Sequence, residues 1–124
     1  MNAVGDEPLA EFSRQVVTAV MPDRTLTTLG ELELIAQLLA EVRRDTDNRS
    51  AIIMLRLHAH GFGHVSGEHP GALHLDVAWA AEQLATRLIV RARVAASEWN
   101  RLESNLLELR AQLRRRVGAE AVRR

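Results

Sequence analysis

The chain has 124 residues, of which 47% are apolar and 26% charged, enough for one globular domain with a buried core. The chain has no cysteine, which excludes disulfides and thiolate ligands. It has no apolar run near the roughly 18 residues that span a bilayer and no signal-peptide pattern, so we expect no membrane span. Net charge is zero, and all sixteen basic residues are arginine, a bias that we attribute to the GC-rich coding of many bacteria. We therefore expect a cytoplasmic protein.

Three short helices are predicted in the first half of the chain. An acidic cap and a proline precede the first apolar stripe, and Thr28 and Glu31 form a capping box before the second. The third apolar run is too short for its periodicity to decide, but a single strand would have no partner in the chain. The three helices are expected over residues 8–20, 28–44 and 51–61.

A loop and one long helix are predicted for the rest of the chain. Residues 62–71 are rich in glycine and histidine, a composition typical of a loop. Residues 72–117 contain neither glycine nor proline, and Gly118 is well placed as a C-cap. The economical interpretation is one continuous helix over residues 72–117, in a single helical domain of residues 1–124.

An unbroken apolar heptad pattern runs along this predicted helix, with alanines in its first half and larger residues in its second. A helix of this length would be roughly 68 Å long, whereas a compact domain of this size is only about 30 to 40 Å across. We therefore expect an all-α protein, in which three short helices pack on one long helix that extends into a coiled-coil-like dimer seam. The predicted partner-binding residues are Trp99, Leu102, Leu106, Leu109 and Leu113.

All five histidines lie between residues 58 and 74. Because imidazole is a common ligand, His58, His60 and His64, together with Glu68, are candidate ligands for a transition metal such as zinc. On a helix, however, His58 and His60 would lie on nearly opposite faces, and we identify no ligand motif such as His-x-x-x-His on a helix. The favoured interpretation is therefore a polar loop without a cofactor, whose histidines cap helix ends or bind backbone carbonyls, and the transition-metal site is the alternative.

The two ends of the chain carry opposite charge. Residues 1–47 hold nine acids and four arginines, whereas residues 77–124 hold five acids and ten arginines. The basic end could contact nucleic-acid phosphates, or it could be a solvated helix terminus that matches the helix dipole. The candidate nucleic-acid residues are Arg110, Arg114, Arg115 and Arg116.

The favoured function is a non-enzymatic helical module for protein–protein interaction or assembly, oligomeric through its C-terminal helix. Its partner would be a second copy of the chain or another helical protein. A DNA-binding regulator and a metal-dependent enzyme or metal sensor are the alternatives. An enzyme is disfavoured because no second, distant residue completes a catalytic group, and the sequence identifies no small-molecule substrate.

Overall fold

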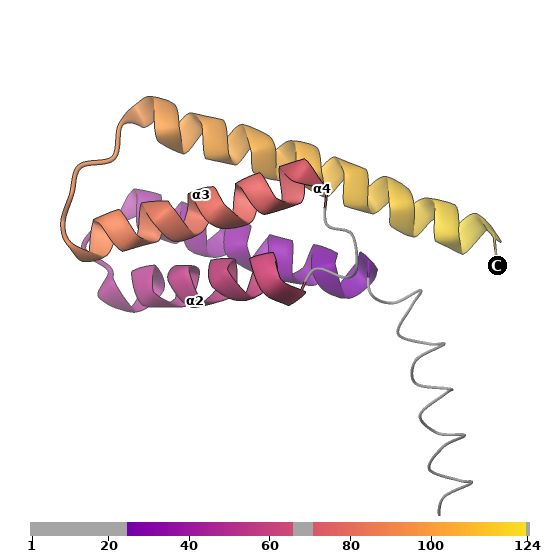
Figure 1. Cartoon of the computed structure of the whole chain (residues 1–124), viewed down its shortest axis with the longest axis horizontal. Coiled ribbons are helices and arrows are strands. Elements are labelled where there is room, and N and C mark those ends of the chain that lie inside the picture. The colour runs from indigo at the N-terminus through magenta and orange to yellow at the C-terminus, as the bar shows by residue number, and fades with distance from the viewer. Residues whose placement is uncertain (1–24, 66–70, 124) are drawn as a thin grey trace, which may run out of the picture.

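The structure is a computed structural model that describes residues 25–65 and 71–123. In this part the chain forms a helix over residues 25–44, followed by α2 (Arg49–Val65), α3 (Ala72–Ile89) and α4 (Ala96–Arg123) (Figure 1). The predicted all-α class is confirmed, while the predicted helix over residues 8–20 lies outside the described residues. None of the described helices is long and apolar enough to cross a membrane.

The second and third predicted helices are present, and the third is longer than expected. Asn48 caps α2, because its side-chain oxygen accepts a hydrogen bond from the Ala51 amide at 3.1 Å. At its other end α2 continues to Val65. It passes through Gly61 and Gly63, although the helix was expected to end at residue 61. Phe62, which is 4% exposed, belongs to the core, and its burial favours the helical path. The predicted loop over residues 62–71 is therefore wrong for residues 62–65.

The single helix predicted over residues 72–117 is also wrong, because the chain turns back between α3 and α4. The Arg91 amide donates to the Leu88 carbonyl and the Ala92 amide to the Arg87 carbonyl, at 3.0 and 2.8 Å. Arg91 has a φ of 60°, in the left-handed region. This pattern is a Schellman motif, in which the left-handed position is usually glycine. The motif ends α3 without the glycine or proline that would have marked the break.

The start of α4 is fastened to the end of α3. The Glu98 carboxylate accepts a hydrogen bond from the Ala95 amide at 3.0 Å, which satisfies one of the free amides at the helix start. The same carboxylate accepts two hydrogen bonds from Arg87, at 2.9 and 3.0 Å. Both interactions lower the pKa of Glu98, with the contact to Arg87 the larger cause. This clamp sets the direction in which α4 returns along the bundle.

The returning α4 packs its leucine stripe into the core of its own chain. The five residues predicted to bind a partner are 2 to 6% exposed and belong to the same buried cluster as the other helices: Trp99, Leu102, Leu106, Leu109 and Leu113. The leucine stripe does not overhang as the inferred dimer seam required, because the turn returns it along the bundle; only the last turns of α4 extend beyond the other described helices (Figure 1). These side chains therefore need no second chain to be buried.

Polar contacts tie the outer edges of α4 to the helix over residues 25–44. Arg43 bonds to Glu103 at 2.7 Å and to Asn100 at 3.1 Å, and its guanidinium lies 5.8 Å from the centre of the Trp99 ring. Glu33 lies 3.5 and 3.6 Å from Arg110 and Arg114. The acidic and basic ends of the chain thus attract each other within one fold.

Candidate functional site

The most conspicuous surface feature is an exposed tryptophan on α3. The inner positions of this helix are buried, among them Ala78, Ala81 and Ala85, while Trp79 is 66% exposed. An indole is a large apolar group, and tryptophans that bind partners dominate many interfaces. Trp79 therefore marks the face of α3 that is not used by the core.

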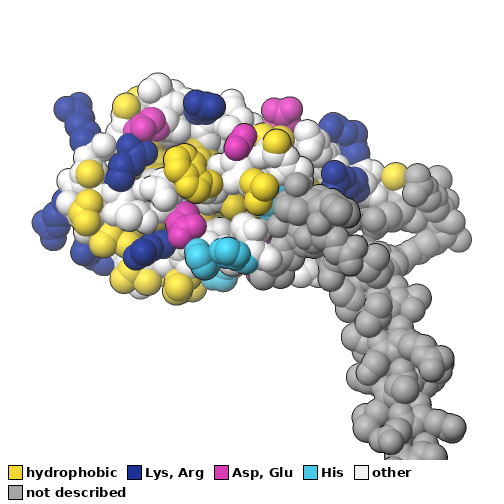
Figure 2. All heavy atoms as spheres, in the orientation of Figure 1, with side chains coloured by type: hydrophobic (Ala, Val, Ile, Leu, Met, Phe, Trp, Pro, Cys, Tyr) yellow, Lys and Arg dark blue, Asp and Glu magenta, His cyan; other side chains and the backbone are white. Residues whose placement is uncertain are grey.

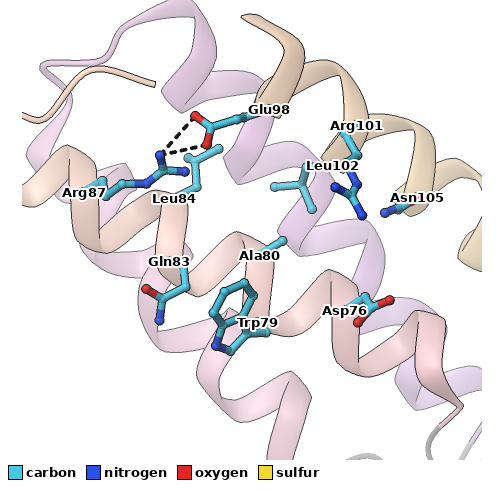
Figure 3. Close-up of a pocket in the computed structure, with 10 residues that line it drawn as sticks. All are labelled: Asp76, Trp79, Ala80, Gln83, Leu84, Arg87, Glu98, Arg101, Leu102 and Asn105. Carbon is cyan, nitrogen blue, oxygen red and sulfur yellow. Dashed lines mark hydrogen bonds and ion pairs between the residues drawn. The ribbon is translucent and has the colours of Figure 1, made fainter. Parts of the chain in front are cut away.

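One groove runs beside Trp79 between α3 and α4. It has a volume of about 420 Å³, and Leu84 and Leu102 contribute apolar side chains to its lining. Figure 3 shows the Arg87–Glu98 pair at one end of this groove and Asp76 toward the other. The groove is thus mixed in character, because Gln83, Arg101 and Asn105 line it together with the apolar side chains.

A second groove, of about 380 Å³, lies on the other side of Trp79, between α2 and α3. It is lined by His60 and His64 from α2 and by Asp76 and Glu82 from α3. Trp79 lines both grooves, so it stands on a ridge between them.

Charges of opposite sign lie at the two ends of the exposed face of α3. Asp76, Trp79, Gln83 and Arg87 follow one another at spacings of three and four residues, which places them along one side of the helix. Asp76 has no ion-pair partner among the residues that the structure describes, whereas Arg87 holds Glu98. The face therefore runs from an acidic end through the uncharged Trp79 and Gln83 to a basic end.

The predicted metal ligands separate into two groups. His58 lies toward the helix over residues 25–44, with its Nδ1 3.2 Å from Glu31. His60 and His64 lie in the α2–α3 groove, with ring centroids 4.5 Å apart. Glu68 lies outside the described residues. Within the described ranges no three ligand-type side chains are gathered as for a metal ion.

The buried histidine is His74, which is 6% exposed and stacks on the Phe62 ring with the centroids 3.9 Å apart. Its Nε2 donates a hydrogen bond to the Phe62 carbonyl at 2.9 Å, so that nitrogen carries the proton. Burial lowers the pKa of His74; the hydrogen bond to Phe62 opposes this effect, and the charge of Arg116 adds to it. Its surroundings assign it a packing role at the contact of α2 and α3.

The four arginines predicted to contact nucleic acid have different surroundings: two lie beside an acidic side chain, and two are exposed to solvent. Arg110 and Arg114 lie beside Glu33, which offsets part of their charge. Arg115 and Arg116 are exposed on the last described turns of α4. The four do not form a patch free of acidic neighbours.

Trp79 was not among the predicted partner-binding residues. The heptad frame placed it beside the seam of one long helix, where packing was the expected role. Once α3 ends at Ile89, Trp79 lies opposite the alanines that face the core. In the sequence, Trp79 is three residues after Asp76 and four before Gln83, and this helical spacing places it on the same side of the helix as two polar residues. That spacing was the available sign that Trp79 is exposed.

No known protein family, curated protein or solved structure matches the chain significantly. The functional argument therefore depends on the chain's own surfaces.

Proposed function

We propose that this protein is a non-enzymatic assembly module that pairs with a second copy of itself through the exposed face of α3. The observation that carries the proposal is Trp79, 66% exposed on a ridge between two grooves. Burying apolar surface stabilises association by about 25 cal/mol per Å², and an indole offers one of the largest such areas of any side chain. This face replaces the leucine stripe of α4 as the proposed interface.

The charges on this face favour a second copy of the chain as the partner. In an antiparallel pair of α3 helices centred between Trp79 and Gln83, Asp76 of each copy lies opposite Arg87 of the other. Both charge pairs then form at once, as the two-fold symmetry of a homodimer requires. A parallel pair would instead set Asp76 against Asp76 and Arg87 against Arg87, which is repulsive. The pairing is therefore antiparallel.

The shape of this face is compatible with the same arrangement. Each Trp79 ridge would enter the α3–α4 groove of the other copy, whose lining combines the largely buried Leu84 and Leu102 with polar side chains. Arg87 is partly exposed, with its side chain at 38%, so a second carboxylate can approach it while Glu98 stays bound. Exposed charge pairs contribute only about 0.2 to 1 kcal/mol each, so Trp79 supplies the affinity and the charges set the direction.

The test is the mass in solution, measured by light scattering over a range of concentrations. The natural chain should approach twice the mass of one chain as concentration rises, and Trp79→Ala should remain monomeric. Leu107→Ala is the matched control, because Leu107 is 56% exposed on α4, away from the face of α3, and its variant should dimerise normally. A natural chain that stays monomeric at millimolar concentration would overturn the proposal, as would a Trp79→Ala variant that dimerises fully.

A further inference from the structure

The α2–α3 groove holds a pair of histidines whose placement on a helix is that of a metal-binding motif. Because α2 extends to Val65, His60 and His64 are four residues apart on one helix and share a face. Their rings lie 4.5 Å apart, centre to centre, and are tilted by 53°. Zinc binds imidazole nitrogen at about 2.0 to 2.1 Å, so one ion can reach both rings after small side-chain rotations.

A third residue, Glu82, fixes the chemistry of His60. Its Oε1 lies 3.0 Å from His60 Nδ1, and since a carboxylate can only accept, Nδ1 carries the proton in this contact. The lone pair of the neutral ring is then on Nε2. Histidines that bind metals commonly donate their other nitrogen to a carboxylate in this manner, which orients the ring and raises its basicity.

The close approach of α2 and α3 makes this contact feasible. Gly63 lies between the two histidines, and a Cβ atom at that position would come within 3.3 Å of the Ala78 Cβ. The absence of a side chain at Gly63 lets α3 pack closely on α2, and Glu82 lies one helical turn beyond Ala78. Figure 2 shows histidine side chains grouped on the surface beside an acidic side chain.

We propose that His60 and His64 form a two-histidine site for a divalent transition ion of the zinc, nickel or copper type, with Glu82 as a positioning residue. Water would complete the coordination, since two protein ligands leave positions open. The pair differs from the three candidate histidines of the sequence, because His58 lies toward the helix over residues 25–44, with Glu31. None of His60, His64 and Glu82 belongs to the proposed pairing of α3 helices, although Trp79 and Asp76 line the same groove.

The primary experiment titrates the full chain with ZnCl2 at pH 7.5 by calorimetry, in dilute monomeric protein. One zinc ion per chain is expected, with affinity reduced at least about tenfold in His60→Ala and in His64→Ala. His58→Ala is the matched control and should bind zinc within about twofold of the natural chain. Glu82→Gln should weaken binding about tenfold, the lower end of the effect of removing an outer-shell partner.

A second readout uses Trp79, which lines the same groove as both histidines. Nickel ions should quench part of the tryptophan fluorescence of the natural chain, and much less that of Trp79→Phe, which should still bind zinc. Both effects should be lost in acid, since protonated imidazole cannot bind a metal. Circular dichroism checks that each variant keeps its helices, as expected because none of the substituted side chains belongs to the buried core.

Three results would overturn the proposal. The first is no zinc binding by the natural chain up to millimolar ZnCl2. The second is binding that survives both His60→Ala and His64→Ala. The third is an equal loss in His58→Ala, which would indicate unspecific binding to surface histidines.

Discussion

The two tryptophans lie on consecutive helices and have opposite surroundings. Trp99, near the start of α4, is 6% exposed and packs in the core beneath Arg43, whereas Trp79 on α3 is 66% exposed. The difference follows from the turn at residues 90–95, which returns α4 along the bundle and points its apolar stripe inward. A long apolar stripe in a sequence can thus belong to the core of its own chain, while a single large apolar residue outside the stripe is exposed.

The largest expected effect is a difference in stability between alanine variants of the two tryptophans. Trp99→Ala should lower the free energy of unfolding by about 3 to 5 kcal/mol, because it leaves a cavity in the core. Trp79→Ala should change it by no more than about 0.5 kcal/mol in dilute, monomeric protein, since an exposed side chain loses little on truncation. Urea denaturation followed by circular dichroism measures both. Equal losses in the two variants would mean that Trp79 also belongs to the core.

A smaller gain in stability is expected from the turn that separates the two helices. Arg91→Gly should raise the free energy of unfolding by about 1 kcal/mol, because glycine adopts the left-handed conformation at C′ without steric cost. Arg91→Ala is the control, since it keeps a Cβ atom and should gain nothing. The Tm measured by thermal unfolding reports the difference. Glycine that destabilises the fold would contradict the assigned turn.

The smallest expected effect concerns the inner face of α3, where His74 is held neutral by burial. The lowered pKa means that the unfolded chain binds more protons than the folded chain below about pH 6.5. This contribution to stability is therefore present at neutral pH and is lost as pH falls from about 6.5 through the folded-state pKa. His74→Gln, which can still donate to the Phe62 carbonyl, should show a shallower loss between pH 6.5 and 5 in urea denaturation. An unchanged slope would count against this account of His74.

Local patterns in the sequence predicted the all-α class and the second helix, because capping residues and apolar spacing act over a few neighbouring residues. The break after α3 could not be predicted, since Arg91 adopts a conformation that glycine normally marks. That error created the apparent overhang and with it the dimer seam at Trp99 and the four leucines. The structure places those residues in the core, and only the full arrangement of helices decides this.

The proposed histidine site illustrates the same limit of sequence-based prediction. The sequence contains His60 and His64 at helical spacing, but two intervening glycines led to the prediction of a helix end. The helix continues because Phe62 is buried and because Gly63 lets Ala78 approach closely. These are tertiary contacts between α2 and α3, and the contribution of Glu82 to the site depends on them as well.

The central claim is that two copies pair through antiparallel α3 helices, and spin labels test this claim most directly. The chain has no cysteine, so Ala72→Cys and Gln83→Cys each supply one label site on the exposed side of α3. With a rise of 1.5 Å per residue and an axis near residue 81, the backbones at residue 72 should lie about 30 Å apart in the dimer, and those at residue 83 about 10 Å. Pulsed electron spin resonance should find the longer distance between labels at residue 72, and continuous-wave spectra should find the shorter distance between labels at residue 83. Short distances at both positions would indicate a parallel pair, and no dipolar signal at either would contradict pairing through α3.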